Sequence, residues 1–346
     1  MRANSLRIML ALSFALGCGD HMPESVGPAQ EIVVLADADE WAVLEPVVRD
    51  IFEKVIRTPQ IEKIFTIRHG DVENLKAQKH LRRKNLMVLS TLDAKTPTGE
   101  FLRGLLSEDV AGRIRSGKPG VTWKQDVWAR EQLLIVASAI DVDGLIENLR
   151  NESDRLYSAA EEARNRQIVQ LVYKYGERKD VTQQLADDFG WQVRVPFGYR
   201  ILEAKPDSGF VALAKEQPNR WFFVYWEDGV PPDALTEDWV IAKRDEITRR
   251  FFDKDRIAPG EVDVFQSDFS GKLAVVLQGL WENQEKWAGG PFKSYAFVDL
   301  ELDRFFFIDV GIFSPNKQKE TYLRQLDLMA NTFKTAAPES SDRDRS

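Results

Sequence analysis

Apolar residues near the start of the chain follow two spacings in turn. Ile32-Val33-Val34-Leu35 is an unbroken apolar run with the length of a buried strand. From about Asp39 the spacing changes to three and four residues, which is typical of a helix with one buried face. We therefore predict a strand at 31–36 and a helix after it. The apolar stripe of this helix consists of Trp41, Leu44, Val48, Ile51, Phe52 and Val55.

Strands and helices continue to alternate up to residue 140. The pattern predicts helices at 71–79 and at 98–116, the second capped by Thr98. A hairpin is expected around Val127–Glu131. Strands interleaved with helices predict an open α/β sandwich, which we assign to residues 31–140. Its further strands are predicted at 61–68, 85–92, 122–126 and 132–139.

Residues 141–176 are predicted to form one long helix that connects the two halves of the chain. Apolar residues recur at helical spacing toward both ends, and Gly176 ends the pattern. The middle of the segment, residues 151–166, is mostly charged or small. This composition indicates a solvated helix that bridges two domains rather than a buried one.

Segments of strand length dominate the second half, residues 177–335. The pattern predicts strands at 192–195, 199–204, 210–215, 221–226, 262–269, 272–281, 293–302 and 304–313. Helices are expected up to residue 189, at 238–252 and at 317–333, so helices would cover one side of each sheet. The predicted fold class is α+β, with two sheet-and-helix sandwich domains joined by a long helix. A polar tail follows at 336–346.

The first residues resemble a membrane-targeting signal. Arg2 and Arg7 precede an apolar run, Ile8–Gly17, that has the length of a signal peptide and is too short to span a bilayer. The run ends at Gly17-Cys18 and resembles the lipobox of bacterial lipoproteins, in which the cysteine is lipidated and becomes the mature N-terminus. Several acyl chains on Cys18 would give stable anchoring. The alternative is an ordinary secretory signal followed by a stray thiol.

Residues 1–17 are accordingly predicted to be a lipoprotein signal peptide, and residues 18–30 a tether rich in turn residues. By the sorting rules of such lipoproteins, Gly19 after the cysteine favours the outer membrane, facing the periplasm. The expected location is therefore the cell envelope. Cys18 is the only cysteine in the sequence, so no intrachain disulfide can form.

Composition and motifs argue against several classes of function. The formal net charge is -8 and no basic stripe is present, so nucleic-acid binding is not expected. The sequence has neither a phosphate-binding glycine loop nor a dinucleotide motif, so no cofactor is predicted. His21, His69 and His80 lie far apart, so no metal site is predicted. No nucleophilic serine motif occurs.

Four carboxylates near the C-terminus form a candidate for catalysis. Asp299, Glu301 and Asp303 alternate along one predicted strand, and Asp309 lies on the next strand. Paired carboxylates can act as general acid and general base, or can hold Ca²⁺. The leucines that alternate with them already supply a buried face, so the simpler interpretation is a solvated side of the sheet.

The segment from Trp281 to Tyr295 is predicted to contain a loop of unusual content between two strands. Large aromatic side chains on a loop are costly to expose unless they pack or bind. The paired glycines would allow positive φ and a close backbone approach. We therefore predict an interaction surface formed by Trp281, Trp287, Gly289, Gly290, Pro291, Phe292 and Tyr295. The alternative is a tryptophan-plugged loop that closes the end of the sheet.

Seven different short motifs follow one another along the chain in a characteristic order. They are Gln125–Gln132, Val195–Tyr199, Arg244-Asp245, Gly279–Trp281, Trp287–Tyr295, Ser314-Pro315 and Leu323–Leu326. In this order and spacing they resemble the bacterial lipoproteins grouped as domain of unknown function 4837, over nearly the whole mature chain. This chain has Ala288 where many relatives have Met, and Lys319-Glu320 where the family has a basic pair. The resemblance implies a cellular location and an architecture, and it implies no catalytic activity.

The favoured function is a non-enzymatic binding module of the envelope. It would be anchored to the membrane through the N-terminal lipid and would bind an unknown protein or a small ligand. The alternative is an envelope hydrolase that uses the carboxylates from Asp299 to Asp309. A third hypothesis is that the aromatic loop binds envelope glycan by ring stacking. The first is favoured because no His, Ser or Cys nucleophile is placed with a partner, and no catalytic residue can be named.

Overall fold

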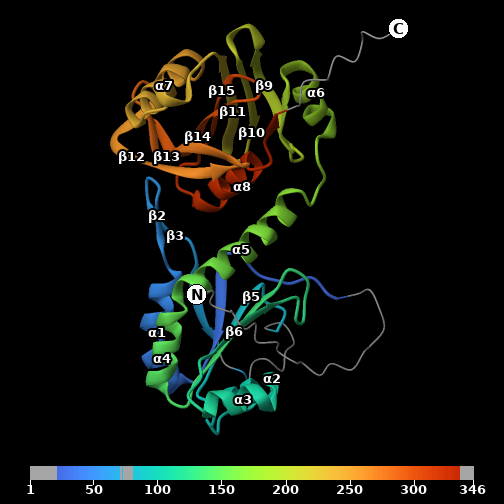
Figure 1. Ribbon diagram of the computed structural model, residues 1–346, viewed down its shortest axis with the longest axis vertical. Helices are drawn as coiled ribbons and strands as arrows, with labels where there is room; N and C mark the ends of the chain where they lie inside the picture. Colours follow the sequence, from blue (N-terminus) through green and yellow to red (C-terminus); the bar gives the residue numbers. More distant parts are fainter. Residues whose placement is uncertain (1–21, 71, 73–80, 336–346) are drawn as a thin grey trace. The chain divides into compact units, whose positions relative to one another are not determined.

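The computed structural model describes residues 22–70, 72 and 81–335 (Figure 1). The predicted signal peptide, Cys18 and the tail at 336–346 lie outside the described residues, as does nearly all of the helix predicted at 71–79. The chain divides into two compact units. The first consists of Met1–Val55 and Lys63–Ile168, and the second of Ile56–Glu62 and Val169–Ser346.

The first unit is built on a five-stranded sheet. Its strand order is β4-β1-β5-β7-β6, in which β6 alone is antiparallel to its neighbour. The central strands are apolar along their whole length because both of their faces are covered. The strands are β1 (Glu31–Leu35), β4 (Thr66–Gly70), β5 (Asn85–Leu89), β6 (Gly120–Gln125) and β7 (Leu133–Ser138).

Helices lie on both faces of this sheet, so the prediction of a one-sided cover is wrong for this unit. Alternate residues of β1 separate the two cores: Ile32 packs with the helices α1 and α4, and Val33 packs with α2. Figure 1 shows α1 and α4 side by side, with α2 and α3 apart from them. The helices are α1 (Ala38–Phe52), α2 (Pro97–Leu105), α3 (Glu108–Arg115) and α4 (Val142–Asn151).

Two helices that the sequence predicts as continuous are interrupted. The helix predicted at 98–116 is divided into α2 and α3, because the hydroxyl of Ser107 accepts a hydrogen bond from the Val110 amide and begins a new helix. The helix predicted at 141–176 is divided into α4 and α5 (Ser153–Val172). Glu152 lies at this break, where its backbone leaves the helical conformation, between Asn151 and Ser153, two residues whose short polar side chains are unfavourable inside a helix. α5 carries the chain from the first unit into the second.

The second unit is built on a seven-stranded antiparallel sheet of order β12-β13-β14-β15-β11-β10-β9. Consecutive strands β12 to β15 pair as hairpins, and β15 then pairs with β11. The strands are β9 (Arg200–Lys205), β10 (Phe210–Lys215), β11 (Asn219–Asp228), β12 (Arg256–Phe269), β13 (Lys272–Asn283), β14 (Ala288–Asp299) and β15 (Arg304–Phe313). All the strands predicted between 199 and 313 are thus present, several of them longer than expected.

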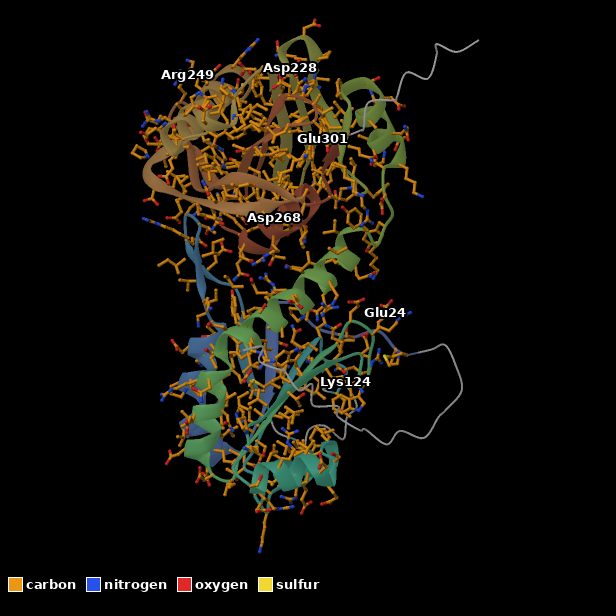
Figure 2. All side chains as sticks on the ribbon, viewed as in Figure 1. Glu24, Lys124, Asp228, Arg249, Asp268 and Glu301 are labelled. Atoms are coloured by element: carbon orange, nitrogen blue, oxygen red, sulfur yellow. The ribbon has the colours of Figure 1, made fainter. Side chains whose placement is uncertain are left out.

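This sheet also has helices on both faces. Leu185 of α6 (Lys179–Phe189) and Leu326 of α8 (Glu320–Ala330) belong to the core on one face. Val240 and Ile247 of α7 (Glu237–Phe251) belong to the core on the other. The side chains fill the space between the sheet and these helices (Figure 2). The fold is therefore mixed, as predicted, but each sheet is the middle of three layers.

Two short two-stranded sheets complete the fold. β2 (Val55–Arg57) pairs with β3 (Ile61–Lys63), and β8 (Trp191–Gln192) pairs with β16 (Lys334–Thr335). Among the described residues, no helix is both long enough and apolar enough to cross a membrane.

Candidate ligand-binding site

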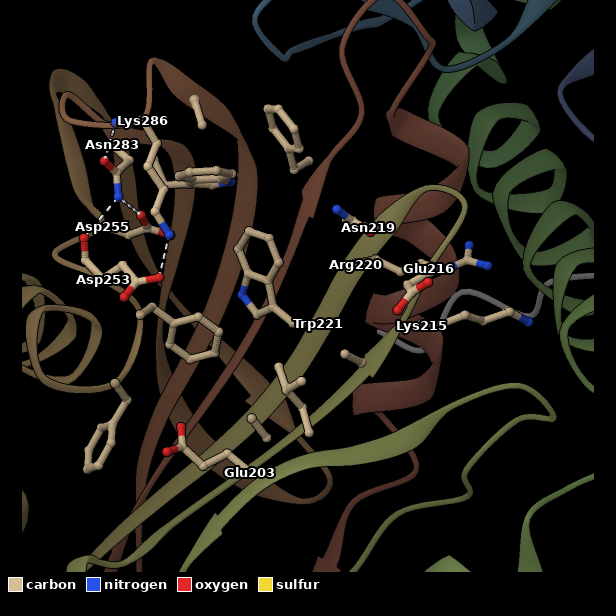
Figure 3. Close-up of a pocket in the computed structure, with 18 of the residues that line it drawn as sticks. Glu203, Lys215, Glu216, Asn219, Arg220, Trp221, Asp253, Asp255, Asn283 and Lys286 are labelled. Carbon is tan, nitrogen blue, oxygen red and sulfur yellow. Dashed lines mark hydrogen bonds and ion pairs between the residues drawn. The ribbon is translucent and has the colours of Figure 1, made fainter.

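A cavity of about 520 Å³ opens on the face of the second sheet that α7 covers. Its floor is aromatic, and small residues of neighbouring strands leave the space above it. Polar and charged side chains form its rim (Figure 3). We call it the Trp221 cavity, after the indole at its centre. The floor is formed by Trp221, Phe252, Trp281, Phe313, Ala212 and Ala288.

Trp221 owes its position to the two strands beside β11. Its cross-strand neighbours are Ala214 on β10 and Gly311 on β15, so neither neighbour fills the space around the indole. A Cβ atom on Gly311 would lie 2.3 Å from Cζ2 of Trp221, which is closer than two carbon atoms can approach. The indole therefore lies against the backbone of β15, and only glycine permits this.

A buried ion pair beneath the floor fixes the orientation of the indole. Nε1 of Trp221 donates a hydrogen bond of 3.2 Å to Oδ1 of Asp309. Oδ2 of the same carboxylate accepts hydrogen bonds from Arg244 Nε at 2.8 Å and from Ser294 Oγ at 2.7 Å. The side chains of Arg244 and Asp309 are 1% and 0% exposed, so the pair is sequestered from water. Three elements, α7, β14 and β15, thus hold one tryptophan.

Arg244 makes a further contact inside this core. Its guanidinium lies over the ring of Phe292, 3.5 Å from the ring centroid, where the negative face of the ring attracts a cation. Its Nη1 atom is buried and has no hydrogen-bond partner among the described residues. A charged group in such surroundings is tolerated because the carboxylate, the ring and the hydroxyl of Ser294 compensate it together.

One rim of the cavity is a hydrogen-bonded polar cluster, which Figure 3 shows beside Trp221. Nδ2 of Asn283 donates hydrogen bonds to Oδ1 of Asp255 at 2.7 Å and to the carbonyl oxygen of Asp253 at 2.9 Å. Oδ1 of Asn283 accepts one from the amide of Lys286 at 2.9 Å, and the ammonium of Lys286 pairs with the carboxylate of Asp253. Asn283 is 3% exposed. Its hydrogen bonds connect the β13–β14 turn to the segment after α7.

Asp255 is the carboxylate of this rim whose chemistry is most altered. Burial raises the pKa of Asp255 above its usual value of 3.8. The hydrogen bond from Asn283 and the charge of Arg244 work in the opposite direction without reversing the shift. A carboxylate in these surroundings is poorly solvated and gains from any donor that a ligand brings to it.

The cationic side chains on the opposite rim already have partners within the protein. Arg200 pairs with Glu216 at 3.1 Å. Lys215 donates to the carbonyl oxygen of Phe197 at 2.9 Å, and Arg220 donates to the side chain of Gln325 at 3.0 Å. Figure 3 shows Lys215 and Arg220 extending away from Trp221. The cavity therefore offers an aromatic surface and carboxylates, and its cations have other partners.

The segment predicted as an aromatic loop is a β-hairpin in the structure. β13 continues to Asn283 and β14 begins at Ala288, so five of the seven predicted residues lie within a paired strand, β14. Gly289 and Gly290 do not adopt positive φ. Gly290 instead allows a close approach, because a Cβ there would lie 2.0 Å from the carbonyl oxygen of Ile312. The expectation of a loop over most of this segment is therefore wrong.

The predicted surface residues are also divided in exposure. Trp281, Phe292 and Tyr295 are 4%, 0% and 4% exposed and belong to the cores, whereas Trp287 is 94% exposed at the turn of the hairpin. Trp281 and Phe292 face α7, and Tyr295 faces α8. The structure therefore does not bring these residues together on one surface. Of the seven, only Trp281 lines the Trp221 cavity.

The four predicted carboxylates are likewise separated. Asp299 follows Tyr295 and Phe297 on the α8 face of the sheet, where it pairs with Lys272 at 2.9 Å. Asp309 lies on the opposite face with Arg244. Glu301 and Asp303 lie in the turn between β14 and β15 rather than on a strand. The alternation expected from the sequence ends at Asp299, so the carboxylates do not form a catalytic pair.

His69, the histidine that the structure describes, has aromatic and backbone neighbours. His69 stacks on Trp41 with ring centroids 4.9 Å apart, and its Nε2 lies 2.8 Å from the carbonyl oxygen of Ala36. His21 and His80 lie outside the described residues. Within the described ranges, no group of three or more His, Cys, Asp or Glu side chains is arranged to hold a metal ion.

Sequence reasoning missed the centre of the site, Trp221, because its strand has an ordinary apolar pattern. A usable signal was the single glycine, Gly311, in the otherwise bulky strand Arg304–Phe313. A glycine inside a strand often marks a close approach by another group. Asp255 and Asn283 are far apart along the chain, and nothing local indicates that they meet.

Comparison with protein families confirms the predicted resemblance for the second half of the chain. Residues 178–332 match the model of the family described as Domain of unknown function (DUF4837). Residues 25–172 match a different family, described as Domain of unknown function (DUF8532). The predicted resemblance to the first family therefore holds for the second half of the chain only, since the first half matches the second family. A search of curated proteins found no match.

Solved structures resemble parts of the chain at low sequence identity. The Ran-binding protein Mog1p of Saccharomyces cerevisiae is 11% identical, with 42% of this chain and 90% of that chain covered and a TM-score of 0.31. LpqN, involved in cell envelope biogenesis of Mycobacterium tuberculosis, is 12% identical, with 42% and 83% covered and a TM-score of 0.27. A protein of Bacteroides thetaiotaomicron is 7% identical, with 43% and 46% covered and a TM-score of 0.27.

Proposed function

We propose that this protein is a non-enzymatic binding module of the cell envelope. It is anchored in the membrane through a lipid on Cys18, and its second unit binds a small ligand in the Trp221 cavity. The observation that carries the binding proposal is the fixed indole of Trp221. It lies on the floor of a cavity, and its ring nitrogen is already bound to Asp309 at 3.2 Å.

The size and lining of the cavity support ligand binding. A volume of about 520 Å³ falls within the range of small-molecule sites, which are concave, mostly apolar and carry a few oriented polar groups. The cavity is also preformed, because Gly311, Asp309 and Asn283 hold its floor and rim without a ligand. A preformed site loses less conformational entropy when it binds.

The anchoring proposal is supported by the leader sequence. A short positive region precedes an apolar run of signal-peptide length, and Gly17-Cys18 follows it directly. The single cysteine of the chain stands at this position, where it would have a chemical role as the site of lipid attachment. An outer-membrane location facing the periplasm follows from Gly19 by the sorting rules of such lipoproteins.

A library of small metabolites and oligosaccharides, screened by thermal denaturation of the full mature chain, tests the binding proposal. Ligands of the cavity raise the melting temperature of the wild type because they bind only the folded state. The same ligands should stabilise Trp287→Ala, whose indole is 94% exposed and outside the cavity lining, and should not stabilise Trp221→Ala. A screen in which every stabilising compound acts equally on Trp221→Ala contradicts the proposal.

A further inference from the structure

We infer that the ligand of the Trp221 cavity is a neutral saccharide, one sugar ring of which stacks on the indole of Trp221 while its hydroxyl groups donate hydrogen bonds to Asp255. This inference rests on the proposed binding function and specifies the class of ligand. It is carried by the shape of the aromatic floor, the acceptors on the rim and the pairing of the charges.

The floor provides one flat aromatic platform. Trp221 and Trp281 meet edge to face, with ring centroids 5.2 Å apart and an interplanar angle of 69°, and Trp281 is 4% exposed. Phe252 is tilted by 37° against Trp221 at 5.9 Å. A cage for an ammonium ion needs several ring faces directed at one point. A sugar ring needs one face, because its polarised C–H bonds lie against the negative surface of a single indole.

The indole is held in a way that suits stacking. Its N–H donates to Asp309 and therefore cannot donate to a ligand from the same geometry. Trp221 can then contribute only its ring face to recognition. Since Gly311 supports the ring from behind, the ligand meets a rigid surface. A rigid aromatic side chain binds without losing rotamer freedom.

The rim supplies acceptors for a ligand rich in hydroxyl groups. An ionised carboxylate only accepts hydrogen bonds. Within the part of the chain that the structure describes, Oδ1 of Asp255 accepts a hydrogen bond from Asn283 and its other carboxylate oxygen accepts none. Glu203 lies below Trp221 in Figure 3, and its carboxylate already pairs with Lys205 at 2.5 Å. The open oxygen of Asp255, beside an aromatic platform, can accept a hydrogen bond from a hydroxyl group at the edge of a stacked sugar ring.

The charges argue against an anionic ligand and against a lipid chain. Arg200 is paired with Glu216, and Lys286 with Asp253, so an anion would have to displace a carboxylate to reach either cation. A hydrocarbon chain would desolvate Asp255 without offering it a donor, which is unfavourable. A nucleoside could stack on Trp221, but its flat base brings few hydroxyl donors to the acceptors of the rim.

Isothermal titration of the full mature chain with defined probes tests the inference. The probes are chitin oligosaccharides, which share the N-acetylated sugars of envelope glycans, and gluco-, manno- and xylo-oligosaccharides, which do not. Choline and adenosine represent the cation and the nucleoside. We expect at least one oligosaccharide series to bind. Trp221→Ala should weaken that binding by about tenfold or more, as for a central aromatic anchor, and Trp287→Ala should leave it unchanged.

Two further variants keep the result interpretable if Trp221→Ala folds poorly. Ala214→Leu keeps every existing contact of the indole and fills the space beside it with a larger side chain. It should therefore abolish binding while the protein remains folded. Asp255→Asn keeps the shape and removes the charge. Saccharide affinity of the wild type should fall as the pH is lowered, at a higher pH than for an ordinary aspartate because burial raises the pKa of Asp255, and Asp255→Asn should remove this pH dependence.

The outcomes separate the inference from the function on which it rests. Binding of choline or adenosine that depends on Trp221, with no oligosaccharide bound, overturns the saccharide inference and leaves the binding function intact. Binding of an oligosaccharide that Ala214→Leu and Trp221→Ala both leave unchanged places the saccharide elsewhere and overturns the inference. Failure of all the probes, together with no Trp221-dependent compound in the thermal screen, overturns both.

Discussion

The indole nitrogen of Trp221 and the carboxylate of Asp309 are joined by a hydrogen bond of 3.2 Å between two neighbouring strands. Through this bond, the orientation of the cavity floor depends on a carboxylate that is 0% exposed. The carboxylate of Asp309 in turn accepts hydrogen bonds from Arg244 and Ser294 in the core. The site and the stability of the second unit are therefore coupled at one residue.

The buried pair gives the first prediction. Arg244→Met should lower the free energy of unfolding by about 3–5 kcal/mol, because it leaves the carboxylate of Asp309 buried without a compensating charge. Denaturant unfolding of the second unit, followed by tryptophan fluorescence, measures this loss.

The matched double variant separates lost charge pairing from lost packing. Asp309→Asn removes the charge and keeps one acceptor oxygen, which can still accept from the indole N–H of Trp221, while its NH2 group can donate to the hydroxyl of Ser294. The loss in the double variant Arg244→Met, Asp309→Asn should be smaller than the sum of the two single losses, because no unpaired charge remains. Additive losses would show that the two side chains act independently.

The two tryptophans of the β13–β14 hairpin should respond very differently to substitution. Trp281→Ala is expected to cost about 3–5 kcal/mol, since the side chain is 4% exposed and packs between Trp221 and Phe313. Trp287→Ala should change stability by less than about 0.5 kcal/mol, because its ring is 94% exposed. Unfolding midpoints of the two variants make the comparison, and equal losses would contradict the structure.

Acid stability should depend on Asp299. Burial favours its protonated form, but hydrogen bonds from Lys272 and Thr335 outweigh this and hold the pKa of Asp299 below its usual value of 3.8. A depressed pKa means that the contribution is present above pH 3.8 and is lost as the pH falls through the lower value in the folded state. The contribution should be roughly 1–2 kcal/mol, since Lys272 is 30% exposed.

Unfolding free energies measured from pH 6 down to pH 2 test this dependence. Asp299→Asn should be less stable than the wild type at pH 6, and the difference should shrink in acid. Lys272→Met should show the same trend. A constant difference across the pH range would exclude the pair as its cause.

Lipidation of Cys18 is the prediction that decides the membrane anchor. Cells that express the protein with an alkyne fatty acid should incorporate the label into the wild type, since an acylated N-terminal cysteine provides stable anchoring. Cys18→Ser should take up no label and should be released from the membrane fraction. Equal labelling of both proteins would exclude Cys18 as the site.

The sequence predicts those features of the structure that depend on residues close together along the chain. The strands at 210–215, 272–281 and 304–313 were predictable because unbroken apolar runs bounded by turn residues occupy consecutive positions. The same runs misled the prediction of layers. A strand such as Phe305–Val310 is apolar on both faces, and this indicates helices on both sides of the sheet rather than on one.

The Trp281–Tyr295 segment shows why the candidate site could not be predicted in the same way. Glycine and proline residues suggested a loop, although in the structure Gly290 and Pro291 are paired with β13. Their role is to let Trp281 and β15 approach the strand, and this requires knowledge of the neighbours across the sheet. The residues that meet around Trp221 come from β9, β10, β11, β13, β14 and β15 and from the end of α7 and the segment after it, and their separation along the chain leaves no local pattern.

The N-terminus of α8 is capped by a residue far away in the sequence, Glu62, and this contact gives the last prediction. Glu62, in the part of the β2–β3 hairpin that belongs to the second unit, is 5% exposed. Its carboxylate accepts hydrogen bonds from the backbone amides of Lys319, at 2.8 and 3.0 Å, and of Glu320, at 2.9 Å. The helix has no side-chain cap of its own, so Glu62 satisfies amides that would otherwise be buried without a partner.

Glu62→Ala should therefore destabilise the second unit by about 1–2 kcal/mol, as the loss of a helix cap does. It should also speed hydrogen exchange at the amides of Lys319 and Glu320, because these groups lose their acceptor. Glu62→Gln provides the matched control, since it keeps an acceptor oxygen and loses the charge that favours a helix N-terminus; it should give a smaller loss. Unchanged exchange at these two amides in Glu62→Ala would show that water or another group replaces the carboxylate, and that α8 does not depend on the hairpin.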